Sequence, residues 1–207
     1  METGTKRVKV EEIAGDLPLL HWTSTAWAEL AARELPTFLA DHAVCEQQVA
    51  MYALSLAGLY PEDMELVQKA GALAAEEVQH FRRVVAILER RGWPLAARRK
   101  NPWVHALRER IDHRAGAWTK VDRLLFGAMI EARSCERFTR LLEVLDDAEV
   151  CRLLHDLGPA EKRHWLMFYE LAGREAEPEP LAHRWQGWLE FERDLALKLG
   201  VAPTVHG

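Results

Sequence analysis

The chain has 207 residues, of which 49% are apolar, and its formal net charge is −5. That length suits one domain with a sizeable core, and the composition excludes disordered and fibrous chains. No apolar run approaches the roughly 18 residues needed to cross a bilayer, and the N-terminus shows no signal or transit pattern. We therefore expect a cytoplasmic protein with no membrane partner. The three cysteines form no Cys-x-x-Cys pair, so any electrons that the protein needs must come from a separate reductase.

Helical periodicity runs through the whole sequence, and no segment has the alternation of a strand. Thr23 or Ser24 is placed to cap the first helix, and Gly92 with Pro94 ends the long one before the connection. A Gly158–Pro159 pair inside one helix predicts a kink or a local wide turn. The expected helices cover about 24–32, 36–59, 62–91, 104–114, 120–145, 148–171 and 182–199.

The arrangement falls into halves, because two long helices joined by a tight turn precede a long connection and two more long helices. This is the one-crossover topology of ferritin-like four-helix bundles. We expect an all-α fold of that kind with additional short helices at both ends. A single domain would span 1–207, with its core bundle over about 35–172 and the last helix docking on it.

Two Glu-x-x-His units carry the chemistry of this sequence: Glu77 with His80, and Glu161 with His164. Residues three apart on a helix project from neighbouring points of one face, so each pair can reach a common metal ion. One such unit alone is weak evidence, because a chain rich in Glu and His contains it by chance.

A glutamate precedes each unit at nearly the same distance, Glu46 by 31 residues and Glu131 by 30. One Glu from each of two helices and a Glu-x-x-His from each of the others is the pattern of di-iron and di-manganese carboxylate proteins. Four carboxylates and two imidazoles suit iron or manganese better than zinc or magnesium. The predicted metal ligands, also the predicted catalytic residues, are Glu46, Glu77, His80, Glu131, Glu161 and His164.

The helical faces guide the choice between neighbouring glutamates. Glu131 lies on an apolar face with small residues, whereas Glu136 shares a face with arginines and is expected to be solvated. Glu76 lies beside Lys69 and Arg83, so Glu77 is preferred as the ligand. His42, one turn before Glu46, is a candidate for a hydrogen bond behind that ligand.

Positive charge is concentrated in the middle of the chain. Residues 82–123 hold twelve Lys and Arg against four Asp and Glu, which gives +8 locally and leaves −13 for the remainder. A segment of this kind can attract a polyanion, although solvated helix ends give the same composition.

Four segments resemble the MiaE-type tRNA hydroxylases: HAVCE at 42–46, EEVQHF at 76–81, RRG at 90–92 and, most specifically, IEARSCERF at 130–138. The similarity covers roughly residues 17–172. The Gly-Pro-Ala stretch at 158–160 departs from the family pattern and puts the local helix geometry before Glu161 in doubt.

The resemblance implies hydroxylation of the isopentenyl group of 2-methylthio-N6-isopentenyladenosine beside the tRNA anticodon, with two iron ions, dioxygen and electrons from an external electron-transfer protein. A tRNA anticodon loop would then be the partner of the basic segment. The expected nucleic-acid contacts are Arg98, Arg99, Lys100, Arg108, Arg110 and Arg114. Two alternatives stay open: a diiron oxygenase or oxidase acting on a small molecule, and a ferritin-like iron-storage protein.

Overall fold

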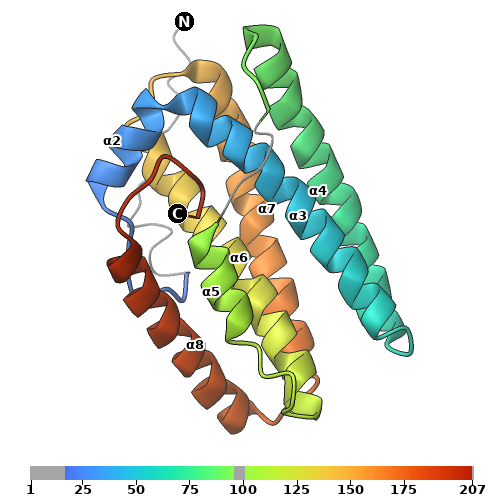
Figure 1. Ribbon diagram of the computed structural model, residues 1–207. Coiled ribbons are helices and arrows are strands. Elements are labelled where there is room, and N and C mark those ends of the chain that lie inside the picture. The colour runs from blue at the N-terminus through green and yellow to red at the C-terminus, as the bar shows by residue number, and fades with distance from the viewer. Residues whose placement is uncertain (1–16, 96–100, 207) are drawn as a thin grey trace, which may run out of the picture.

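The computed structural model describes residues 17–95 and 101–206, and within these ranges every regular element is an α-helix (Figure 1). The helix expected over about 104–114 ends earlier, at Glu109. The helix expected over about 182–199 begins earlier, at Pro178. The helices are α2 (Thr25–Arg33), α3 (Leu35–Leu59), α4 (Met64–Arg91), α5 (Pro102–Glu109), α6 (Ala117–Leu142), α7 (Ala148–Gly173) and α8 (Pro178–Leu199).

Side chains of the expected kinds begin and end these helices. Asp63 accepts a hydrogen bond from the backbone N–H of Leu66 at the start of α4, and Gly92 ends that helix with a φ of 65°. Asn101 caps α5 in the same way, directly before Pro102. These local signals fix where the chain leaves each helix, and thus where the long connection starts.

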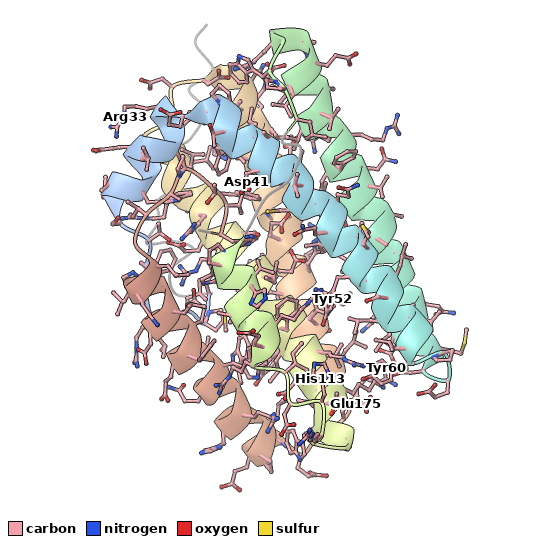
Figure 2. All side chains as sticks on the ribbon, viewed as in Figure 1. Arg33, Asp41, Tyr52, Tyr60, His113 and Glu175 are labelled. Atoms are coloured by element: carbon pink, nitrogen blue, oxygen red, sulfur yellow. The ribbon has the colours of Figure 1, made fainter. Side chains whose placement is uncertain are left out.

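Four long helices form the bundle, with α3 packed along α4 and α6 packed along α7 (Figure 1). The connection between the two pairs carries α5, which lies against α6 and α8. The expected all-α bundle with one long crossover is confirmed. Tyr60 and Glu175 mark the end of the bundle where α6 starts (Figure 2).

Helix α7 continues through Pro159, which lies two residues before Glu161 and five before His164. Proline has no backbone N–H, so the carbonyl of residue 155 lacks its usual helical donor. The neighbouring carbonyl of Gly158 accepts a hydrogen bond from the thiol of Cys135 in α6, with Sγ and O 3.3 Å apart. The departure from the family pattern therefore lies inside a helix that is continuous in the structure.

The interior consists of two apolar clusters. One contains Trp27, Phe38 and Leu154, and the other contains Leu124 and Phe168. Helices α3, α4, α6 and α7 contribute to both clusters, and each carries a buried glutamate near the point where it passes from one to the other. The bundle thus holds a polar layer between two apolar ones. Among the described residues, no helix combines the length and the apolar character that a membrane span requires.

Candidate metal centre

The six residues singled out by their spacing meet inside the bundle. Their exposed fractions range from 0% for Glu77 to 5% for His80. The residues come from the four long helices, and the i, i+3 spacing of the two Glu-x-x-His units turns both members of each unit inward. Within the described ranges, their ligand atoms form two groups, each with all atoms within 4.8 Å of one another.

Two carboxylates belong to both groups. Glu46 and His80 complete one group, Glu131 and His164 complete the other, and Glu77 and Glu161 are common to the two. Two metal ions could therefore be held here, with Glu77 and Glu161 available to both. The arrangement also preserves the pseudo-twofold relation that the equal spacing predicted.

Both histidines direct Nδ1 toward the carboxylates. His80 Nδ1 lies 3.3 Å from Glu77 Oε2 and 3.6 Å from Glu46 Oε2. His164 Nδ1 lies 2.7 Å from Glu77 Oε1 and 3.9 Å from Glu131 Oε2. The two rings are 6.0 Å apart between centroids. The opposite ring atoms, Nε2, point away from the centre.

The crowding of four buried carboxylates in this cluster favours the binding of a cation. Burial, reinforced by the charge of neighbouring Glu77, raises the pKa of Glu46, Glu131 and Glu161 well above the usual range. Burial alone would also raise the pKa of Glu77, but contacts with Glu46 and the two histidines hold it well below that range. Several like charges cannot share a dry volume unless a positive charge neutralises them.

The two histidines of the cluster also have raised pKa values, although burial acts on them in the opposite direction. Burial by itself lowers their pKa, but contacts with the carboxylates outweigh it and raise the pKa of His80 to about 10 and that of His164 to about 9. Divalent metal ions supply the same positive charge and bind the deprotonated ligands, so protons and metal compete for these atoms.

The orphaned atoms indicate how well the residues fit metal ions. Both carboxylate oxygens of Glu77 and Nδ1 of both histidines are buried without a hydrogen bond of acceptable geometry to any described residue, as are Oε1 of Glu131 and Oε1 of Glu161. Buried polar atoms are rarely left in that state in proteins. Their number and common direction fit a pair of metal ions, and the O/N donor set suits iron or manganese.

A shell of further groups holds the candidate ligands. Nε2 of His42 hydrogen bonds to Oε1 of Glu46, as expected from their spacing. Burial, followed by the charge of His80, lowers the pKa of His42 to about 3, so a neutral ring lies behind that carboxyl group.

Glu76, which its sequence neighbours set aside in favour of Glu77, also reaches the centre from outside. Its Oε2 lies 3.1 Å from Nε2 of His164, and its Oε1 lies 3.9 Å from Nε2 of His80. Arg163 holds the same carboxylate at 2.7 Å. The sequence signal for this role of Glu76 was the Glu-Glu pair at 76–77, because adjacent helical positions can place two carboxylates on either side of one histidine.

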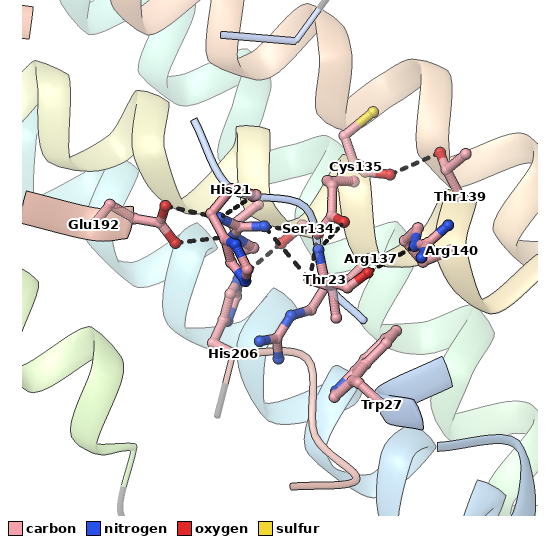
Figure 3. Close-up of polar contacts among 12 residues, drawn as sticks. His21, Thr23, Trp27, Ser134, Cys135, Arg137, Thr139, Arg140, Glu192 and His206 are labelled. Carbon is pink, nitrogen blue, oxygen red and sulfur yellow. Dashed lines mark hydrogen bonds and ion pairs between the residues drawn. The ribbon is translucent and has the colours of Figure 1, made fainter. Parts of the chain in front are cut away.

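The expectation that Glu136 is solvated is wrong. Glu136 is 0% exposed and accepts hydrogen bonds from the backbone N–H and the hydroxyl of Thr23, at 2.8 and 2.7 Å. Arg133 pairs with it at 2.8 Å and also with Glu192 of α8 at 2.7 Å. Figure 3 shows how these partners from distant segments converge on α6. This face of α6 is rich in charged residues, but these charges pair with one another, and residues 17–23 and α8 cover them.

A cavity of about 560 Å³ leads to this centre. Glu131 lines its buried end, while Arg108 and His105 of α5 line its exposed mouth. Between them the walls are largely apolar, with Tyr52 and Phe126 among the lining residues. The arrangement can accommodate an apolar group next to the metal centre while a polar part of the same molecule stays at the surface.

The predicted nucleic-acid contacts divide into three kinds. Arg98, Arg99 and Lys100 lie outside the described residues. Arg108 and Arg114 are exposed. Arg110 is half-buried, with its guanidinium 5.4 Å from the ring centroid of Trp188 and 5.0 Å from that of Phe191.

The fold is shared with a solved structure from Synechococcus, "Protein 43 with aldehyde deformylating oxygenase activity". The TM-score is 0.86 at 28% sequence identity, and the match covers 91% of this chain and 95% of that one. Fold and site together define a ferritin-like protein of the di-metal carboxylate class, the class that includes dioxygen-activating enzymes.

The sequence comparisons give the family. Residues 14–207 match the family described as tRNA-(MS[2]IO[6]A)-hydroxylase (MiaE), and the chain belongs to that family. A tRNA 2-(methylsulfanyl)-N(6)-isopentenyladenosine(37) hydroxylase from Pseudomonas putida is 40% identical over 151 residues, which is 72% of each chain. A hydroxylase of the same name from Salmonella typhimurium is 25% identical over 224 aligned residues, covering 84% of this chain and 82% of the relative.

Proposed function

We propose that this protein hydroxylates the isopentenyl group of 2-methylthio-N6-isopentenyladenosine next to the tRNA anticodon, with dioxygen as co-substrate and two iron ions as cofactor. The observation that carries the proposal is the cavity that joins the exposed side chains of His105 and Arg108 in α5 to Glu131 at the candidate metal centre. Family membership supports the same substrate, since the relatives are named for it.

The six buried residues are proposed as the iron ligands. Glu77 and Glu161 would lie between the two ions, Glu46 and His80 would hold one ion, and Glu131 and His164 the other. The ions would supply the reductive activation of dioxygen. The surrounding residues would orient the ligands: His42 through Glu46, and Glu76 through Nε2 of both histidines.

The substrate is proposed to enter with its prenyl tail first. The apolar walls formed by Tyr52, Phe126 and Phe168 would exclude water and hold the tail, while the base stays toward Arg108 and His105. A base in a single-stranded loop can turn into such a pocket without the cost of melting a duplex. The reaction consumes one C–H bond, one dioxygen, two electrons and two protons, and yields the alcohol and one water.

The macromolecular partners are proposed from charge and from the electrons that the reaction needs. Arg108, Arg110 and Arg114, with Arg98, Arg99 and Lys100 of the undescribed segment, are proposed to meet the tRNA backbone. The two electrons are proposed to come from an external electron-transfer protein.

Nucleoside analysis of tRNA tests the function. Cells that make the prenylated precursor are compared with and without this gene, and the gene-deleted cells are complemented with wild type or with Glu131→Ala. We expect the hydroxylated nucleoside to disappear on deletion, its precursor to accumulate, and only the wild-type gene to reverse the change. Identical profiles with and without the gene would reject the tRNA substrate and redirect the search to small apolar substrates of the same cavity.

A further inference from the structure

The chain after α8 turns back and inserts into the bundle (Figure 1). The carbonyl of Thr204 accepts hydrogen bonds from the indole of Trp27 at 3.2 Å and from Arg137 at 3.1 Å. Arg137 also donates to the carbonyl of Val205 at 2.9 Å, and the backbone N–H of Val205 donates to Asp41 at 2.7 Å. Partners on α2, α3 and α6 thus fix this segment.

These contacts place His206 against Ser134 of α6 (Figure 3), and His206 lines the same cavity as Glu131. Its Nε2 lies 3.0 Å from Oγ of Ser134, one turn after Glu131. Its Nδ1 lies 3.5 Å from Sγ of Cys45, which directly precedes Glu46. The ring, 1% exposed, therefore bridges α3 and α6 at the level of one candidate ligand from each half.

One face of the imidazole is covered. It stacks on Trp103 of α5 with centroids 5.0 Å apart and planes 4° apart. The indole N–H of Trp103 donates to Glu192 at 3.2 Å, and Glu192 pairs with buried Arg133. His206 lines the cavity whereas Trp103 does not, so the imidazole forms the wall between the indole and the cavity.

We propose that His206 determines which methyl group of the prenyl tail is oxidised, an inference that rests on the proposed function. The isopentenyl group ends in two methyl groups on one double-bonded carbon, chemically alike and distinct only in position. Discrimination between them requires a rigid wall at the buried end of the cavity, because small displacements decide which C–H bond meets the oxidant. His206 is held by Ser134, Cys45 and Trp103, so its plane is fixed before substrate enters.

The test measures the ratio of the two isomeric alcohols in digested tRNA after reaction with the iron-loaded, full-length protein. His206→Ala removes the wall, His206→Leu restores apolar volume without a plane, and His206→Phe restores a plane that can stack on Trp103. His183→Ala in α8, an exposed histidine, is the matched control. We expect wild type, control and Phe to give one isomer in large excess, and Ala and Leu to lower that ratio at least tenfold.

Two further measurements distinguish a loss of substrate positioning from damage to the folded protein. Iron content and tRNA affinity, measured without dioxygen, should stay within twofold of wild type in all variants. An unchanged isomer ratio in Ala or Leu would overturn the inference, as would a wild-type protein that makes both isomers equally. If His206→Ala does not fold, Leu against Phe decides. A wild-type protein that leaves prenylated tRNA unmodified would instead reject the proposed function, and the inference with it.

Discussion

Glu76 and Glu77 are adjacent in α4, yet their carboxylates lie on opposite sides of the same two histidine rings. Glu77 faces the Nδ1 atoms at 3.3 and 2.7 Å, and Glu76 faces the Nε2 atoms at 3.9 and 3.1 Å. A carboxylate behind a histidine ligand fixes the tautomer and orients the ring, and it strengthens the ligand. One residue thus serves both Glu-x-x-His units.

We expect Glu76→Ala to weaken iron binding about 10–100-fold, the usual effect of losing such a partner. Glu76→Gln should fall between this variant and wild type, because its amide oxygen still accepts a hydrogen bond but carries no charge. Anaerobic Fe(II) titration measures the effect. Glu62→Gln, at an exposed position of the α3–α4 turn, is the control. Equal affinities in all four proteins would show that Glu76 does not support the histidines.

Two buried glutamates of α6 allow a sharper comparison. Glu131 lies among like charges, whereas Glu136 neutralises buried Arg133. Glu131→Ala should abolish iron loading and hydroxylation, while the iron-free protein keeps or gains stability because a crowded carboxylate is removed.

Glu136→Ala should have the opposite outcome, with a loss of about 1–3 kcal/mol in the free energy of unfolding, because the buried N–H and hydroxyl of Thr23 lose their acceptor and Arg133 keeps only Glu192 as an acidic partner. Iron titration and urea unfolding of the iron-free proteins check both. Full iron loading of Glu131→Ala would contradict its assignment as a ligand.

At the level of helices, Asp63 joins three elements. It caps α4 through the N–H of Leu66 at 3.1 Å, and it pairs with Lys120 of α6 at 2.8 Å and with Arg174 after α7 at 3.3 Å. Lys120 also reaches Glu175 at 2.6 Å. This end of the bundle is therefore held by a shared set of charges.

We expect Asp63→Ala to lower the free energy of unfolding by about 1–2 kcal/mol, and Asp63→Asn, which keeps the cap, by less. The hydrogen bond from Lys120 lowers the pKa of Asp63 to about 2. A depressed folded-state pKa stabilises the protein above the unfolded value and loses that effect as pH falls toward 2. The difference between wild type and Asp63→Asn in urea unfolding should thus shrink from pH 7 to pH 3. Asp146→Ala, at an exposed position, is the control.

Gly127 of α6 packs against the ring of Phe168 in α7. A Cβ there would lie 2.9 Å from the ring of Phe168, which lines the same cavity. We expect Gly127→Ala to cost about 1–3 kcal/mol of stability and to raise KM for prenylated tRNA, because the ring must shift.

Gly71→Ala in α4 is the matched control for this change. A Cβ at Gly71 meets no atom within 4 Å, so the substitution should be neutral or stabilising by about 0.5–1 kcal/mol. Thermal unfolding and steady-state kinetics of both variants decide. Identical behaviour of the two would exclude a role for close packing at Gly127.

Over the whole molecule, the +8 segment is less uniform than its sequence indicates. Arg83 pairs with Asp156 at 2.7 Å, and Arg91 pairs with Asp147 and Glu149 at 2.6 Å each. The basic residues at the end of α4 are thus neutralised by α7. Arg108, at the cavity mouth, and Arg114 are exposed, so both can reach a polyanion.

We expect the double variant Arg108→Ala/Arg114→Ala to weaken tRNA binding and to reduce the slope of log K against log salt by roughly 0.7 for each phosphate that the variant no longer neutralises. Arg83→Ala/Arg90→Ala removes equal charge from the paired surface and should leave the slope unchanged. Binding measured from low to moderate salt distinguishes the two. A slope equally reduced in both would indicate a diffuse attraction rather than an interface at Arg108 and Arg114.

Local sequence predicts the helical class, the cap at Ser24, the stop at Gly92 and the six residues that meet in the bundle, whereas the ends of the crossover helix and of the last helix differ from those expected. The successful predictions rest on short-range geometry: an i, i+3 pair must share a helical face, and Gly92 acts on the turn next to it. The nearly equal spacing of Glu46 and Glu131 from the two units added the pseudo-twofold relation, since helices of similar length place their midpoints at one level.

What covers each face, by contrast, follows from tertiary packing alone. Glu136 is buried because Thr23 and Arg133 pair with it and Glu192 of α8 pairs with Arg133, and periodicity within α6 contains no record of that cover. His206 reaches the cavity for the same kind of reason. The local sequence specifies a helix face through its own spacing, but whether that face meets solvent or another segment depends on packing between distant parts of the chain.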